Sequence, residues 1–148
     1  MDTPASESER WLRAVYLHDA LRDAPREFLE SLTDRRWQTT ELLHGPAAAE
    51  YAARLGERDR GVLDAVRFHS VGYAGWDQVG RMLYLGDYLE PGRHFRKEER
   101  QALANRVPRE PRVVLMEVAA ERMHWLITSG WLLLPETVEF WNALVDPS

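Results

Sequence analysis

One carboxylate stands out in this sequence because it interrupts an apolar helical pattern. It is Asp87, in the stretch Leu83–Arg93, which reads LYLGDYLEPGR. The Pro91-Gly92 pair is expected to end the helix and to leave the basic Arg93 just beyond it. An ionised carboxylate is costly to bury unless it is paired, hydrogen-bonded or bound to a metal ion, so Asp87 requires a partner.

Imidazole and carboxylate groups upstream of this stretch could converge with Asp87 on a metal centre. The candidate ligands are His18, Asp19, His44, His69 and Asp87. Because the chain has no cysteine, any ion must be held by nitrogen and oxygen, a donor set that suits iron, manganese or zinc. Two such ions close together could activate a shared hydroxide and clamp phosphate oxygens. Taken singly, each residue also has an ordinary structural explanation, so a helical scaffold with structural histidines stays open.

Apolar spacing predicts that helices position these side chains. His18 and Asp19 share one helix, where consecutive side chains point about 100° apart and can reach an ion from neighbouring directions. His44 stands at the mouth of an alanine-rich helix, and His69 lies near the end of the next one. The expected helices cover residues 10–23, 26–32, 47–55, 59–70, 76–90, 97–105, 111–130 and 136–145. No strand pattern is present in the sequence, so we expect an all-α fold.

Length and composition indicate one globular domain. With 148 residues, we expect a disordered or irregular tail over residues 1–9 and a helical domain over residues 10–146. The net charge of −5 argues against a nucleic-acid duplex as a partner, although the patch of Arg93, Arg96, Lys97 and Arg100 could contact phosphates locally. The polar start and the short apolar runs predict neither a signal peptide nor a membrane partner, and they fit a cytoplasmic protein.

The order and the flanks of the candidate ligands match a known pattern. The four motifs are YLHDALR over residues 16–22, LLHGP over 42–46, AVRFHSVG over 65–72, and the stretch Leu83–Arg93. The segment LPETV over residues 134–138, with Asn142, agrees as well. Together they resemble the HD superfamily of metal-dependent phosphohydrolases, and more narrowly the YqeK-type symmetrical diadenosine tetraphosphate hydrolases. The resemblance runs from about Trp11 to Leu144.

This resemblance implies a helical bundle that binds two divalent ions, usually iron, and splits diadenosine tetraphosphate, a nucleotide polyphosphate, into two ADP. It makes His18, Asp19, His44, His69 and Asp87 metal ligands. Asp19 would bridge the ions, His44 and His69 would serve the second ion, and Asp87 would complete the first. It makes Arg22 and Arg93 phosphate contacts with catalytic roles, Arg22 with bidentate reach. Tyr73 and Trp76 are further substrate-binding candidates, as faces on which adenine could stack.

The chain departs from the family pattern at its start. The family's first metal ligand is a histidine on a helix before the His-Asp pair, and no histidine precedes His18 here. Either the sequence begins at an internal Met and the helix is encoded upstream, or the helix has been lost together with catalysis. Loss of that helix would expose an apolar groove, which a homodimer could cover.

Besides the helical scaffold with structural histidines, the alternatives to symmetrical cleavage of diadenosine tetraphosphate fall into two classes. The first keeps the HD phosphohydrolase but gives it another nucleotide or phosphoester as substrate. The second is a catalytically silent module that binds a nucleotide or a metal, or an interaction domain. Product analysis separates the first from the leading function, and ligand binding without turnover would identify the second.

Overall fold

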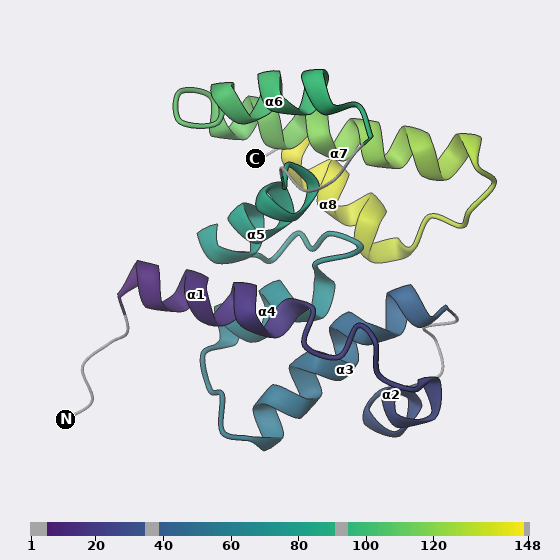
Figure 1. Ribbon diagram of the computed structural model, residues 1–148. Coiled ribbons are helices and arrows are strands. Elements are labelled where there is room, and N and C mark those ends of the chain that lie inside the picture. Colours follow the sequence, from purple (N-terminus) through teal and green to yellow (C-terminus); the bar gives the residue numbers. More distant parts are fainter. Residues whose placement is uncertain (1–5, 35–38, 91–94, 147–148) are drawn as a thin grey trace.

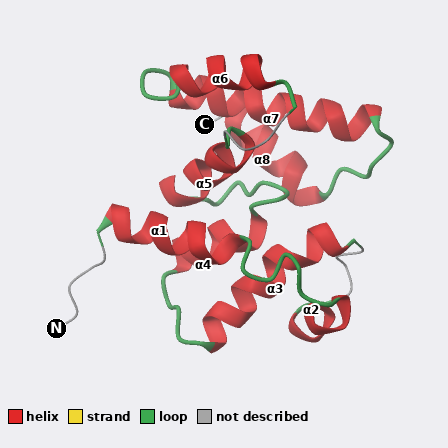
Figure 2. Cartoon of the chain, in the orientation of Figure 1, coloured by secondary structure: helices red, strands yellow, loops and turns green. Residues whose placement is uncertain are grey.

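The computed structural model describes residues 6–34, 39–90 and 95–146, and every regular element in these ranges is an α-helix (Figure 2). The all-α prediction is therefore confirmed. The helices are α1 (Glu7–His18), α2 (Arg26–Leu32), α3 (Thr40–Arg54), α4 (Arg60–Phe68), α5 (Gln78–Tyr88), α6 (Lys97–Arg106), α7 (Pro111–Thr128) and α8 (Pro135–Val145).

Side-chain caps explain where several helices begin. The Ser6 hydroxyl accepts a hydrogen bond from the Glu9 amide, so α1 begins at Glu7 and residues 7–9 are helical where a tail was expected. The Thr39 hydroxyl accepts from the Leu42 amide and starts α3 at Thr40. Asp59 and Asp77 cap α4 and α5 in the same way. These caps fix the starts of the four helices that carry the candidate site.

Two boundaries differ from the prediction in ways that matter for the site. The first helix ends at His18 rather than near residue 23, so Asp19 is its C-cap residue and lies outside the helix. The third helix starts seven residues earlier than residue 47, which places His44 inside it and Pro46 within its interior. Proline costs a helix one hydrogen bond, and the prediction of a helix mouth at Pro46 was wrong because the Thr39 cap supplies an earlier start.

The helices form two connected groups (Figure 1). Helices α6, α7 and α8 lie together, α2, α3 and α4 lie together, and α5 contacts both α4 and α7. The largest apolar cluster joins α5, α7 and α8 around Tyr84, Val118 and Phe140. A second cluster fills the space where α1, α4 and α5 meet, around Ala14, Val62 and Val79. The candidate site lies beside this second cluster, so burial of apolar surface holds its helices together.

No helix among the described residues combines the length and apolar character that crossing a bilayer requires.

Candidate metal centre

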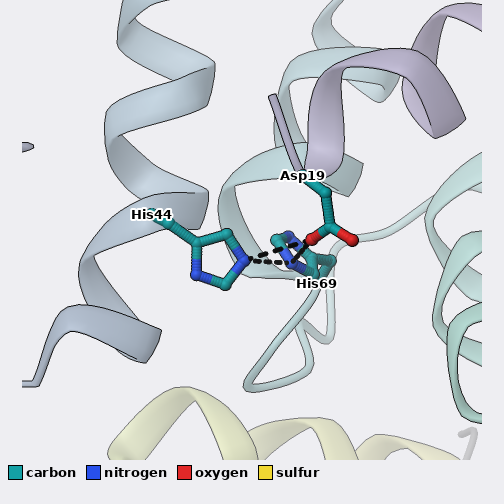
Figure 3. Close-up of side chains that lie close together, drawn as sticks. All are labelled: Asp19, His44 and His69. Atoms are coloured by element: carbon teal, nitrogen blue, oxygen red, sulfur yellow. Dashed lines mark hydrogen bonds and ion pairs between the residues drawn. The ribbon is translucent and has the colours of Figure 1, made fainter. Parts of the chain in front are cut away.

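The five predicted ligands converge from four different helices or from the residue that directly follows a helix, as Asp19 follows α1 and His69 follows α4. Asp19 is at the centre: its Oδ1 lies 3.4 Å from His44 Nε2 and 3.8 Å from His69 Nε2. Figure 3 shows Asp19 pointing toward both rings. On the other side, His18 Nε2 lies 3.3 Å from Asp19 Oδ2 and 3.7 Å from Asp87 Oδ1. The structure thus brings together residues that are up to 69 positions apart in the sequence, from His18 to Asp87.

These side chains form two groups that share one carboxylate. His18, Asp19 and Asp87 make one group, and Asp19, His44 and His69 make the other. Within each group, one ligand atom from each residue lies within 4.8 Å of the others. Among the described residues, no other set of three imidazole or carboxylate groups meets this spacing. Asp19 therefore stands where it can serve both groups at once.

The end of α1 gives the site its shared carboxylate. Because Asp19 has left the helix, with φ −108° and ψ 10°, its side chain is free of the 100° spacing that a helix would impose on it and His18. A series of turns follows, in which the Arg22 amide donates to the Asp19 carbonyl. This turn holds Arg22 next to Asp19, on the solvent side of the cluster.

Close approach of α3 to α4 brings His44 to His69. Gly45 lies against the end of α4, where an added Cβ would stand 2.9 Å from the Arg67 carbonyl oxygen and 3.3 Å from a ring carbon of His69. Real Cβ atoms essentially never come as close as the first of these distances. Small buried alanines of α3, Ala48 and Ala49, pack on Val66 of α4. The position after His44 therefore has to be glycine for the two helices to lie this close.

Backbone hydrogen bonds orient two of the three rings. His18 Nδ1 lies 2.6 Å from the Val15 carbonyl oxygen, and His69 Nδ1 lies 2.8 Å from the Val66 carbonyl oxygen. A carbonyl can only accept, so each Nδ1 carries a proton and donates it. In the neutral rings this leaves the lone pair on Nε2, which faces the cluster. The arrangement is the one that fixes the tautomer of metal-binding histidines in proteins.

Burial and charge shift the pKa values of His69 and His18 in opposite directions. Burial lowers the pKa of His69 to about 4, and the neighbouring His44 and His18 rings add to the effect, so His69 is neutral at pH 7. Burial also lowers the pKa of His18, but hydrogen bonds to Asp87 and Val15, together with the charges of Asp19 and Asp87, outweigh it and raise the pKa. A cation is therefore favoured on the His18 side, where two carboxylates meet.

A cleft of about 610 Å³ opens beside the His18 group. Its polar wall carries His18, Asp19, Arg22, Asp87 and Glu90, and its apolar wall carries Trp11, Val15, Val79, Met82 and Leu83. Arg22 lines the cleft and its side chain is exposed there. The cleft gives a small anionic molecule with an apolar part access to the cluster.

Two other predicted substrate residues, Tyr73 and Trp76, are not brought to this cleft. Trp76 is 4% exposed, belongs to the largest apolar cluster, and donates its ring N–H to the Asp64 carbonyl oxygen. Tyr73 stacks on Phe68 with ring centres 4.2 Å apart. Neither residue lines the cleft, and the burial of Trp76 leaves no face on which a base could stack. Arg93 lies outside the described residues.

Sequence reasoning also missed residues that shape the site. Gly45 and the apolar wall residues Trp11 and Val15 were not singled out. For Gly45 the sequence signal is the glycine itself, between His44 and Pro46, because a glycine within a helix can mark a close approach of backbones. Arg100, considered above as a surface phosphate contact, is buried instead. Its spacing of three from buried Leu103 is the sequence signal for an inward side chain.

Comparison with known proteins supports this description. The sequence model of the HD domain family matches residues 2–111 of this chain. The chain is 28% identical over 144 residues to the symmetrical bis(5'-nucleosyl)-tetraphosphatase of Bacillus subtilis, covering 91% of this chain and 76% of that protein. It is 27% identical over 106 residues to the protein of the same name from Halalkalibacterium halodurans, covering 71% of this chain and 56% of that one.

A solved structure with the same fold is a predicted HD superfamily hydrolase involved in NAD metabolism from Clostridium acetobutylicum. It superposes with a TM-score of 0.84 at 25% sequence identity, over 97% of this chain and 79% of that one. The domain match, which spans well over half of the sequence, agrees with the convergence of the histidines and aspartates described above. The chain therefore belongs to the HD domain family of metal-dependent phosphohydrolases.

Proposed function

We propose that the cluster binds two divalent metal ions that share Asp19. The first ion would be held by His18, Asp19 and Asp87, and the second by Asp19, His44 and His69. The single observation that carries the proposal is the pair of ligand groups with one carboxylate in common. For the identity of the ions we propose iron, on the resemblance to the YqeK-type enzymes; manganese and zinc accept the same ligand types.

The spacing of two donor pairs in the second group fits such an ion. Two atoms that each lie about 2.1 Å from one ion stand roughly 3.0–3.4 Å apart when the angle between them is 90–109°. His44 Nε2 and His69 Nε2 are 3.0 Å apart, and His44 Nε2 and Asp19 Oδ1 are 3.4 Å apart. The distances from Asp19 to His69 and from His18 to Asp87 are slightly longer.

We further propose that the substrate is diadenosine tetraphosphate and that the products are two molecules of ADP. Two relatives at 27–28% identity carry the name symmetrical bis(5'-nucleosyl)-tetraphosphatase, which supports this choice. The cleft supports it too, since it has polar and apolar walls and reaches both Asp19 and Arg22. Because a nucleotide of this kind is an intracellular molecule, we propose the cytoplasm as the compartment; neither a membrane nor a nucleic-acid duplex is part of the proposal.

Each residue would contribute a definite step. Bound ions would supply an activated water and would neutralise charge on the phosphoryl oxygens. Arg22 would hold a phosphate of the chain through two parallel N–H donors. His69 and His18 would keep their Nε2 lone pairs directed at the cluster through their Nδ1 hydrogen bonds. Arg93 stays a proposed second phosphate contact with a catalytic role, on the resemblance alone.

One apolar face beside the cleft is relevant to assembly. On α1, Leu12 and Tyr16 are exposed to 66% and 86%, and Trp11 and Val15 continue the same stripe. Exposed apolar surface of this kind is unusual on a monomer. We therefore keep homodimerisation through this face as a proposal.

The test is turnover by the purified 148-residue chain loaded anaerobically with ferrous iron. Diadenosine tetraphosphate is added and the products are separated by ion exchange. ADP alone is the expected result, and equal amounts of ATP and AMP would rule out symmetrical cleavage. His44→Ala should abolish the activity. His124→Ala is the matched control, because His124 is an exposed histidine on α7 away from the cluster.

Other results of this turnover experiment would distinguish the alternative functions. Hydrolysis of another nucleotide or phosphoester, but not of diadenosine tetraphosphate, would keep the enzyme class and change the substrate. Iron and nucleotide binding without any turnover would identify a silent binding module.

A further inference from the structure

A buried arginine on α6 contacts the end of the helix that carries Asp87. Arg100 is 3% exposed, and among the described residues its guanidinium donates to the backbone carbonyl oxygens of Tyr88, Glu90 and Phe95. Nε lies 2.9 Å from the Tyr88 oxygen and Nη1 lies 3.0 Å from the Phe95 oxygen, while Nη2 donates to Glu90. Tyr88 and Glu90 flank the C-cap of α5, so one side chain from α6 holds both sides of that helix end.

The surroundings suit a guanidinium rather than another cation. The last carbonyls of a helix carry the negative end of its dipole and lack partners within the helix. A planar fork with five donors can reach several of them at once, whereas a lysine ammonium is a compact point charge. The Phe95 ring covers the guanidinium at 4.5 Å and packs edge-on against Tyr88, with ring centres 5.7 Å apart.

Asp87 directly precedes the carbonyl that Arg100 holds. Helix ends fray unless they are capped, and a frayed last turn would move the Asp87 carboxylate away from His18. The final hydrogen bond of the helix, from the Leu89 amide to the Leu85 carbonyl at 2.9 Å, lies in the same turn. Helix α6 packs on α7, so Arg100 links this turn to a part of the protein outside the candidate site.

We infer that Arg100 is a positioning residue that fixes the last turn of α5 and so places the Asp87 carboxylate toward His18. The metal-binding part of this inference rests on the proposed function. Loss of a group that orients a ligand typically lowers metal affinity or activity 10- to 100-fold.

The chain offers a matched control on the same helix. Arg106 of α6 pairs with Glu110 and Glu117 and so joins α6 to α7, without a described contact to α5. Arg106→Ala therefore weakens the attachment of α6 but leaves the carbonyls of Tyr88 and Glu90 paired with Arg100. A general effect of loosening α6 would appear in both variants, whereas positioning of Asp87 would fail only when Arg100 is changed.

The experiment compares the wild type with Arg100→Ala, Arg100→Lys and Arg106→Ala as metal-free proteins. Hydrogen exchange is measured at the Leu89 amide, and binding of Mn²⁺ alone is measured by titration calorimetry. Arg100→Ala should speed exchange and lower Mn²⁺ affinity 10- to 100-fold. Arg100→Lys, which stays charged and is expected to fold, should show smaller changes of both kinds. Arg106→Ala should leave both quantities at wild-type values.

Distinct results would overturn the inference. Wild-type exchange at Leu89 in both Arg100 variants would show that the helix end does not depend on Arg100. Faster exchange with unchanged Mn²⁺ affinity would make Arg100 a structural residue only. If the wild type itself binds no Mn²⁺, the proposed metal site fails, and the exchange data still decide whether Arg100 fixes the helix end.

Discussion

The rings of His44 and His69 meet edge-on with their Nε2 atoms 3.0 Å apart, although the two residues are 25 positions apart in the sequence. His69 donates its Nδ1 proton to the Val66 carbonyl, so its neutral ring presents a lone pair to His44. In the metal-free protein, His44 must then supply the proton between the two nitrogens. A bound ion would take the place of that proton at Nε2, and the neutral His44 ring would then carry its proton on Nδ1 instead.

This pair depends on the absence of a side chain at residue 45. Gly45→Ala would place a Cβ 2.9 Å from the Arg67 carbonyl oxygen, so α3 and α4 must move apart. We expect a loss of about 1–3 kcal/mol in the free energy of unfolding, measured by urea denaturation, and a clear loss of Mn²⁺ affinity.

A second glycine provides the control. At Gly86 an added Cβ meets nothing within 4 Å, and the residue lies within α5, next to Asp87. Gly86→Ala should therefore stabilise the protein by roughly 0.5–1 kcal/mol through helix propensity and leave Mn²⁺ binding unchanged. Equal effects of the two substitutions would argue that steric contact at Gly45 is unimportant.

Metal binding should raise the melting temperature through the same ligands. An ion at 100 times its dissociation constant adds about 2.7 kcal/mol to folding, which corresponds to roughly 5–10 °C for a domain of this size. We expect Mn²⁺ to produce such a shift in calorimetry and EDTA to reverse it. His44→Ala should lose most of the shift and His124→Ala should keep it. A shift that survives in His44→Ala would place the ion elsewhere.

The helix that ends at His18, directly before Asp19, is held in place by an ion-pair network. Arg10 of α1 binds Asp59 at 2.7 Å and Asp77 at 2.6 Å, the two residues that cap α4 and α5. The hydrogen bond from Arg10 lowers the pKa of Asp59 despite the opposing effect of burial. As the pH falls, Asp59 is therefore protonated at a higher pH in the unfolded chain than in the folded protein. The stabilisation is complete above about pH 4 and is lost as the pH drops through the lowered folded value.

Asp59→Asn tests this pH dependence, because asparagine still caps a helix but carries no charge. We expect a loss of about 1–2 kcal/mol near pH 7 and a flatter fall of stability below pH 4, measured by urea denaturation. Asp64 should behave in the opposite way, since burial raises its pKa and its charge costs stability at neutral pH. Matching pH profiles of stability for Asp59→Asn and Asp64→Asn would contradict the opposite pKa shifts of these two carboxyl groups.

The fold was accessible from the sequence because apolar spacing and turn residues are local signals. All eight expected helices appear among the described residues, and the four motifs located the five converging side chains. The boundaries were less accessible. The start of α3 depends on a single hydroxyl at Thr39, and the end of α1 depends on how Asp19 turns away from the helix. Both are decided by the capping and turn geometry of single residues, which a periodic apolar pattern does not contain.

Contacts between distant residues were the part that the sequence could not supply. Arg10 pairs with Asp59 across 49 positions, and Arg100 lies buried in a segment whose charge suggested a solvent-exposed face. Trp76 fills the core although a stacking role was considered for it, because an aromatic side chain fits either environment. Such choices depend on which helices meet, and only the structure defines that.

The apolar stripe of α1 predicts self-association. We expect the wild type to elute as a dimer in size-exclusion chromatography with light scattering, because Leu12 and Tyr16 would be covered in a symmetric pair. Tyr16→Glu should give a monomer. Leu132→Glu is the control, since Leu132 is 78% exposed and follows α7 at a different part of the chain. A wild type that stays monomeric at high concentration would remove the dimer proposal.

Arg22 should determine how tightly the substrate binds rather than whether the ions bind. Its exposed guanidinium lines the cleft beside Asp19 and can pair with a phosphate through two donors. We expect Arg22→Ala to raise the KM for diadenosine tetraphosphate roughly 10- to 100-fold, the value of a lost charge-assisted pair. Arg22→Lys should recover part of this, because lysine keeps the charge without the bidentate geometry.

The control for Arg22 is another exposed arginine that does not line the cleft. Arg26 of α2 pairs with Glu30 one helical turn away, so Arg26→Ala changes the net charge equally without removing a phosphate contact. Mn²⁺ affinity should remain at the wild-type value in all three variants, since neither arginine is a proposed ligand. An unchanged KM in Arg22→Ala would mean that the phosphate chain lies elsewhere in the cleft. The same increase in Arg26→Ala would mean that Arg22 acts only through net charge.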